Sequence, residues 1–417
     1  MASTHRFSAE GRDGRLASAP CGGPDRCASR PADVQAAART WPLAGKGVVH
    51  EPRTWGHAPG RERVGAWDEP TRLLRCRRSP REWARSGNVR GQERLVRVLS
   101  VLEICAGAGG QAIGLEAAGF RHAAAVEIDE QACATLRRNR PLWDVLEQDV
   151  RDVSGRDYRG VDLIAGGVPC PPFSIAGLRE GPNDERDLFP EALRLVAEAR
   201  PSAVMLENVR GLATAKFADY RETIRHTLAR LGYEVEWQIL NASEHGVPQL
   251  RPRFILVAVR SKYMTRWHWP TPVGSPPLVG DVLAPQMSAF GWEGAAAWQS
   301  RARAIAPTLV GGSRRHGGPD LGPTRARQAW SLLGVDGRGI ANHAPNEVEF
   351  APADHIPRLT LSMAAKIQGF PDEWRFEGKK TAAYRQIGNA FCPPVAEAVG
   401  QSIKAALGVT RRRLEVA

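Results

Sequence analysis

The sequence predicts an α/β protein with a doubly wound, mostly parallel β-sheet, and two observations support this prediction. From Val98 onward, short apolar runs alternate with segments of helical periodicity over about 160 residues, the order of a sheet whose parallel strands are joined by crossover helices. A glycine-rich loop follows the first run, and acidic residues stand at the ends of later runs. Because ligands of such sheets bind beyond the carboxyl ends of the strands, these residues are expected to share one site.

Each predicted element rests on its own local pattern. Short apolar runs bounded by turn residues predict strands at 97–105, 123–129, 161–167, 202–208 and 253–260. Apolar residues spaced three and four apart predict helices at 111–120, 130–139, 186–199 and 220–231. A further strand candidate precedes Asp149.

The composition narrows the class of protein. Of the 417 residues, 42% are hydrophobic and 24% are charged, as in soluble globular proteins of two or three domains. No run of 18 apolar residues and no signal-peptide core is found. The seven cysteines are odd in number and lack C-x2-C spacing, which argues against a zinc ribbon or a disulfide framework. We therefore expect a cytoplasmic protein with no metal and no membrane contact.

The net charge of +12 is concentrated near the N-terminus. Residues 1–97 hold 19 Lys and Arg against 10 Asp and Glu, a net charge of +9, so the rest of the chain carries only +3. This segment is rich in Arg, Gly, Pro and Ala and lacks apolar periodicity. We interpret it as a disordered extension, or as upstream codons translated from a start assigned too early. The alternative, which we consider second, is a basic arm that binds phosphates. DNA binding is therefore not inferred from net charge.

Gly107, Gly109 and Gly110 form the loop between the first predicted strand and helix. Glu127 ends the second strand, where a carboxylate can accept hydrogen bonds from ribose hydroxyls. Asp149 stands where it can meet an adenine amino group. The loop also fits a loose nicotinamide-nucleotide fingerprint, so an NAD-binding oxidoreductase stays open on this evidence.

Cys170 lies in the stretch GGVPCPPFS at the end of the fourth predicted strand. The glycines allow close approach of a ligand and the prolines fix the backbone, as the positioning of a nucleophile requires. Glu207 ends the next strand, and Arg251 and Arg253 begin the last one. Since alternate residues of a strand face the same way, both arginines are expected to point at one site with the thiol and the carboxyl group.

Eight short motifs follow one another along the chain: EICAGAGG, VEIDEQA, QDVRDV, GGVPCPPFSIAG, ENVRGL, QLRPRF, RLTLSMAAKIQGFPDEW and YRQIGNAFCPPVAEAVG. In this order the chain resembles the DNA (cytosine-5) methyltransferases. The resemblance implies a Rossmann-like fold of the S-adenosylmethionine-dependent type. It also implies methyl transfer to C5 of a cytosine that is flipped out of double-stranded DNA.

The resemblance assigns roles residue by residue. It implies that Cys170 attacks C6, Glu207 binds N3, Arg253 binds O2 and Arg251 braces the loop or the carboxylate. S-adenosyl-L-methionine would be held by Gly107, Gly109, Gly110, Glu127, Asp149, Pro169, Leu188 and Asn389. DNA contacts are implied for Ser174, Gln249, Thr308, Leu309, Arg314 and Arg315.

The resemblance also suggests how the chain is divided. The expected segments are the extension 1–97, a catalytic domain 98–265, a smaller irregular target recognition domain 266–356, a supporting segment 357–380, and a C-terminal segment 381–417 that returns to the catalytic domain. The five tryptophans from Trp267 to Trp330 are interpreted as core rather than as base-stacking platforms. A nucleoid-associated monomer is expected, with a cognate restriction endonuclease acting separately.

Two departures from the family pattern and one alternative stay open. Cys105 stands where the family usually has a Phe that stacks on the donor adenine, and Pro171 stands where it often has Gln. A tRNA cytosine-5 methyltransferase of the same family is the alternative function. That branch carries a Cys-Phe-Thr tripeptide, which this sequence lacks.

Overall fold

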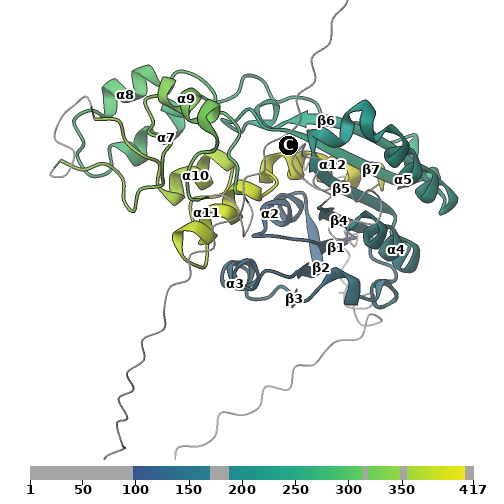
Figure 1. Ribbon diagram of the computed structural model, residues 1–417. Helices are drawn as coiled ribbons and strands as arrows, with labels where there is room; N and C mark the ends of the chain where they lie inside the picture. The colour runs from purple at the N-terminus through teal and green to yellow at the C-terminus, as the bar shows by residue number, and fades with distance from the viewer. Residues whose placement is uncertain (1–96, 170–186, 313–317, 348–354, 409–417) are drawn as a thin grey trace, which may run out of the picture. The chain divides into compact units, whose positions relative to one another are not determined.

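The computed structural model describes residues 97–169, 187–312, 318–347 and 355–408 (Figure 1). Within these ranges, seven strands form one sheet in the order β3-β2-β1-β4-β5-β7-β6. The strands are β1 (Leu99–Ile104), β2 (Phe120–Glu127), β3 (Val145–Glu147), β4 (Leu163–Gly167), β5 (Ala203–Val209), β6 (Tyr233–Asn241) and β7 (Pro252–Arg260). Strands β1 to β5 pair in parallel, whereas β7 lies antiparallel between β5 and β6. The predicted α/β fold with a mostly parallel sheet is confirmed.

The described helices are α2 (Gly110–Ala117), α3 (Glu130–Asn139), α4 (Phe189–Ala199), α5 (Ala218–Arg230), α6 (Ser261–Met264), α7 (Val279–Met287), α8 (Ala295–Arg301), α9 (Thr324–Leu332), α10 (Leu361–Gln368), α11 (Lys380–Asn389) and α12 (Pro393–Ala406). Short 3-10 turns are η1 (Val150–Asp152), η2 (Gly155–Tyr158), η4 (Arg210–Ala213), η5 (Ala215–Phe217) and η6 (Ala242–His245). None of the helices in these ranges is long and apolar enough to cross a membrane.

Alternation along β1 divides the core between the two faces of the sheet. Leu99 and Val101 pack with α2 and α12 in one apolar cluster. Leu102 and Ile104 point the other way and pack with α4 and α5 in a second cluster. A strand buried on both faces reads as a nearly continuous apolar run, because every side chain meets a helix layer.

The strand register gathers the predicted site residues at one edge. Gly166 lies beside Ile104, and Gly167 lies beside Glu207. The antiparallel direction of β7 brings its first residues to the same edge, where Arg253 lies beside Val209. A carboxyl end of β5 and an amino end of β7 can therefore supply charges of opposite sign to one place.

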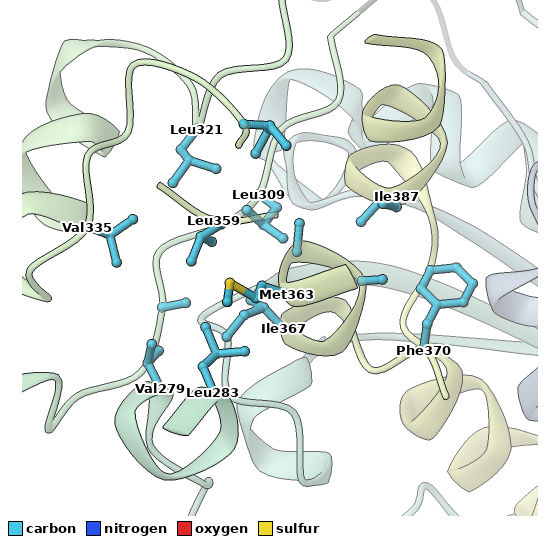
Figure 2. Packing of buried hydrophobic residues seen from close by; sticks show 14 of the residues in the cluster. Val279, Leu283, Leu309, Leu321, Val335, Leu359, Met363, Ile367, Phe370 and Ile387 are labelled. Carbon is cyan, nitrogen blue, oxygen red and sulfur yellow. The ribbon is translucent and has the colours of Figure 1, made fainter. Parts of the chain in front are cut away.

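The chain after β7 supplies most of a third apolar cluster, with residues of α7, α8, α9, α10 and α11, and Ala125 of β2 and Leu136 of α3 belong to it as well. Figure 2 shows part of this packing, including Leu283 of α7, Ile367 of α10 and Ile387 of α11. Trp292, Trp298 and Trp330 are buried within this cluster, and Trp267 is buried against the sheet. Trp269 is half-buried beside the same sheet-side cluster. The interpretation as core is confirmed for Trp267, Trp292, Trp298 and Trp330.

Candidate active site

A cavity of about 680 Å³ opens at the carboxyl ends of the parallel strands, a volume within the range of small-molecule sites. Among the residues lining it are most of those predicted to hold the methyl donor: Gly107, Gly110, Glu127, Asp149, Pro169, Leu188 and Asn389. Glu207 lines the same space. The residues predicted to bind the methyl donor and the predicted catalytic carboxyl group therefore share one cavity.

The glycine loop has a shape that side chains would disturb. Gly107 and Gly109 have positive φ angles of 54° and 91°, which L-residues rarely adopt. A Cβ on Gly110 would lie 2.2 Å from the carbonyl oxygen of Phe391, so this glycine lets α2 begin against the chain that precedes α12. Gly109 faces Leu136 and Trp374 rather than the cavity.

Glu127 is fixed by backbone hydrogen bonds. Its Oε2 accepts from the N–H of Gly107 at 2.7 Å, and its Oε1 accepts from the N–H groups of Ile128 and Asp129 at 2.9 and 2.8 Å. Burial raises the pKa of this carboxyl group, while the three N–H donors counteract part of the shift. The carboxylate thus joins the ends of β1 and β2 and faces the cavity.

Asp149 begins the turn η1 beside the cavity. Its Oδ1 accepts from the N–H of Arg151 at 2.9 Å, and its Oδ2 pairs with the guanidinium of the same residue at 2.9 Å. The side chain is partly exposed, so its carboxylate is available to a ligand. Arg151, which also lines the cavity, was not predicted from the sequence.

Glu207 lines the cavity and forms an ion pair with Arg253. The Nε of Arg253 lies 2.9 Å from Oε1 of Glu207, and both side chains are less than 15% exposed. Burial raises the pKa of Glu207, and the nearby guanidiniums of Arg253 and Arg251 oppose that shift. A carboxyl group in this setting can exchange a proton nearer to neutral pH than an exposed one.

Arg251 does not direct its guanidinium to this pair. It is buried and donates to the carbonyl oxygens of Leu309, Gly388 and Ala390 at 2.7, 2.8 and 2.9 Å. The expectation that both arginines point at one site came from strand alternation. Because β7 begins only at Pro252, Arg251 lies before the strand, where alternation no longer sets its direction.

Gln249 and Leu309 are buried next to Arg251, in a junction that these three residues form with α10. They do not lie on a surface that DNA could reach. Gln249 is fully buried and donates to the side chain of Gln368 at 2.9 Å and to the carbonyl of Ile367 at 3.2 Å. Its Oε1 accepts from the N–H of Leu309 at 2.9 Å. Gln249 is 0% exposed, so it offers no surface to DNA in this structure.

Thr308 and Asn389 are chain neighbours of the residues whose carbonyls Arg251 binds. The Thr308 hydroxyl is half-buried and donates to the carbonyl of Leu250 at 2.6 Å. Asn389 is exposed, lines the cavity and donates to the carbonyl of Gly312 at 3.1 Å. The carbonyl of Leu309, the next residue after Thr308, accepts from Arg251, which also donates to the carbonyl of the cavity residue Ala390. The middle of the predicted recognition segment is therefore linked to the cavity wall.

Several predicted residues lie outside the described ranges: Cys170, Ser174, Arg314 and Arg315. Pro169, the residue before Cys170, lines the cavity, and its carbonyl accepts from the N–H of Leu188 at 3.2 Å. The carbonyl of Val168 accepts from the Asn208 side chain at 2.8 Å. Within the described ranges, no group of three or more His, Cys, Asp or Glu side chains is arranged to hold a metal ion.

Sequence reasoning also missed Ile128, Asp129 and Arg385, which line the cavity as well. Ile128 is 65% exposed and offers apolar surface to the cavity. Arg385 lies 3.5 Å from Oδ2 of Asp129, whose Oδ1 caps the N-terminus of α3. Asp129 belongs to the motif VEIDEQA and Arg385 to the motif YRQIGNA, so both motifs are visible in the sequence. Their proximity depends on the fold, because 256 positions of chain separate them.

Several known proteins are similar to this chain in sequence. The family model for C-5 cytosine-specific DNA methylase matches residues 99–405. Type II methyltransferase M.NaeI of Lentzea aerocolonigenes is 55% identical over 318 residues, covering 75% of this chain and 76% of that protein. M.NgoMIV of Neisseria gonorrhoeae is 52% identical over 310 residues, covering 73% of this chain and 97% of that protein.

Solved structures show the same fold at lower identity. A DNMT2 of Spodoptera frugiperda is 17% identical with a TM-score of 0.53, covering 74% of this chain and 99% of that one. The methyltransferase EhMeth of Entamoeba histolytica is 14% identical with a TM-score of 0.54, covering 75% and 99%. These structures support the fold, and the family model together with the two relatives establishes that the chain belongs to the C-5 cytosine-specific DNA methylases and is a DNA cytosine-5 methyltransferase.

Proposed function

We propose that this enzyme transfers a methyl group from S-adenosylmethionine to C5 of a cytosine flipped out of a specific duplex sequence, through a covalent bond between Cys170 and C6. One observation carries the proposal furthest. The residues suited to an adenosine ligand line one cavity together with Glu207, whose carboxylate pairs with Arg253. A donor and an extruded base can therefore meet in it.

The chemistry accounts for each catalytic group. Attack by the Cys170 thiolate on C6 breaks the aromatic system and moves negative charge toward N3, where the Glu207 carboxyl group donates a proton or a hydrogen bond. Arg253 holds O2 of the ring. C5 then takes the methyl group from the donor sulfonium, loses its proton to a base, and the C6–S bond breaks to release Cys170. Arg251 acts in this scheme by holding the cavity wall.

The base must leave the helix before any of this occurs, because C6 is inaccessible within a stacked duplex. Extrusion costs a few kcal/mol, which contacts to the surrounding DNA must offset. Transfer of tritium from labelled S-adenosylmethionine to duplex DNA, with no transfer to tRNA, tests the proposal. Labelling of tRNA alone would support the alternative function, and no labelling of either would refute both.

Glu127→Ala is expected to weaken donor binding by about tenfold to a hundredfold, because a carboxylate that accepts ribose hydroxyls is lost. The variant also loses the acceptor for the Gly107 N–H. The KM for DNA should stay near the wild-type value. Calorimetry with S-adenosylhomocysteine measures the change. Glu147→Ala, at the exposed end of β3 and outside the cavity wall, is the matched control; equal losses in both variants would contradict the assignment.

We propose that residues 266–356 choose the DNA sequence, with 357–380 as support. The catalytic edge of the sheet carries the groups that the reaction requires, so neighbouring base pairs must be read elsewhere. Arginines suited to guanine O6 and N7 or to phosphates occur here at Arg301, Arg303, Arg325 and Arg327. Arg303 is exposed and pairs with Asp281 at 2.9 Å, so it can exchange that partner for a phosphate.

Exchange of residues 266–356 for those of a relative with a different target should move methylation to the relative's site. The physical reason is that base-edge contacts, and not the reaction itself, carry sequence information. Bisulfite sequencing of host DNA reads the outcome. An active hybrid that still methylates the original site would place recognition outside this segment.

The biological setting is also a proposal. Both close relatives are named Type II methyltransferases, which supports a role in protecting host DNA from a cognate restriction endonuclease that acts as a separate protein. The enzyme would work as a monomer on double-stranded DNA. Challenge of methylated DNA with a panel of restriction endonucleases would identify the protected site.

A further inference from the structure

Trp374 makes a long-range contact with the glycine loop of the cavity. The residue lies between α10 and α11 and is 4% exposed. Its indole Nε1 donates to the carbonyl oxygen of Ala108 at 3.1 Å, across 266 positions of sequence. Ala108 lines the cavity. A side chain from the far end of the chain therefore fixes part of the wall that faces the ligand.

The contact holds one peptide group from two sides. The carbonyl of Ala108 accepts from Trp374, and the N–H of the same peptide, on Gly109, donates to the carbonyl of Ala106 at 3.1 Å. A Cβ on Gly109 would lie 2.9 Å from the indole ring and 2.9 Å from Leu136. The ring thus lies against the loop where its φ angle is 91°, and the peptide plane has little freedom to rotate.

Trp374 is itself held from the sheet side. The guanidinium of Arg140 lies 5.2 Å from the indole ring centroid, and its Nε donates to Glu116 of α2 at 2.8 Å. Three residues further along, the N–H of Glu377 donates to the Thr135 hydroxyl of α3 at 2.8 Å. The indole therefore has a fixed position from which to hold the loop.

We propose that Trp374 is a positioning residue for the methyl donor, because it holds the loop from Ala106 to Gly109 in the shape that the ligand meets. This inference rests on the proposed use of S-adenosylmethionine. Trp374 would then affect the affinity for the methyl donor, in addition to packing in the same apolar cluster as α10.

Trp374→Phe keeps an aromatic ring and removes the N–H donor. Its dissociation constant for S-adenosylhomocysteine, measured by calorimetry, should rise about threefold to tenfold, with the KM for DNA unchanged. Trp298→Phe is the matched control, because Trp298 is also fully buried and its Nε1 also donates to a backbone carbonyl, that of Gly334, at 3.1 Å. The control should lose similar thermal stability and keep wild-type donor affinity.

Trp374→His is the rescue variant. An imidazole can place its Nε2–H near the position of the indole nitrogen, so donor affinity should lie between wild type and Trp374→Phe. Unchanged affinity in Trp374→Phe, or equal weakening in the Trp298→Phe control, would overturn the inference while leaving the proposed function intact. If the wild-type enzyme itself fails to bind S-adenosylhomocysteine, the proposed function fails first.

Discussion

Cys170→Ser should abolish methyl transfer while DNA binding stays close to the wild-type affinity. A serine hydroxyl remains protonated at neutral pH, whereas a cysteine thiol ionises with a pKa of about 8.5 and its thiolate is intrinsically a strong nucleophile. Without attack on C6, C5 has no route to accept a methyl group. Turnover should fall by at least about a thousandfold, as when a nucleophile is removed from other covalent enzymes. Filter binding and tritium transfer measure the two properties separately.

DNA that contains 5-fluorocytosine provides a direct test of the covalent step. Fluorine cannot leave C5 as a proton does, so the wild-type enzyme should remain bound to the base through C6 and survive denaturing electrophoresis. Cys170→Ser should form no such adduct. An adduct in the serine variant would show that another residue is the nucleophile.

Glu207→Gln should lower kcat by about a hundredfold to ten-thousandfold, the usual contribution of a positioned acid or base. The amide can donate a hydrogen bond to N3 but cannot give up a proton, and it leaves the guanidinium of Arg253 without its carboxylate in a largely buried site. Glu198→Gln is the control, since Glu198 also pairs with an arginine, Arg194 at 3.1 Å, and lies outside the cavity wall. Similar kcat values for Glu207→Gln and wild type would exclude the carboxyl group from the reaction.

The pH dependence of the wild-type enzyme carries a related expectation. Burial raises the pKa of Glu207, so its protonated form persists to higher pH than that of an exposed carboxyl group. If the protonated form acts on N3, activity is present below the folded-state pKa of Glu207 and is lost as pH rises through it. The alkaline decline of kcat should therefore flatten in Glu207→Gln, which has no proton to lose there.

Most of the sheet could be predicted because its central strands are covered on both faces. β1, β4 and β5 lie inside the sheet and read as continuous apolar runs, which the sequence displays directly. β6 was not predicted, since it lies at the edge and shows an alternating pattern, Tyr233-Glu-Val-Glu-Trp. Alternation of apolar and polar residues is itself a strand signal, so the sequence of β6 does indicate a strand, although it contains no continuous apolar run.

The site residues also fall into those that local sequence patterns predict and those whose contacts depend on distant segments. Glu127 and Glu207 were predicted because strand ends in a doubly wound sheet converge, a rule that depends only on local pattern and topology. The direction of Arg251 and the contact of Trp374 depend on segments far away in the sequence, and no local pattern encodes which carbonyl a side chain will reach. The resemblance implied that Arg251 braces the loop or the carboxylate, but the carbonyls that it binds, those of Leu309, Gly388 and Ala390, follow only from the fold.

The partners of Arg251 have a consequence for how this enzyme family can diversify. Each of the three oxygens that its guanidinium binds belongs to the main chain, at Leu309, Gly388 and Ala390. Every amino acid carries such an oxygen, so substitutions that keep the backbone path leave this joint unchanged. Under the proposed assignment of sequence recognition to residues 266–356, side chains there can then change the target sequence without altering this joint.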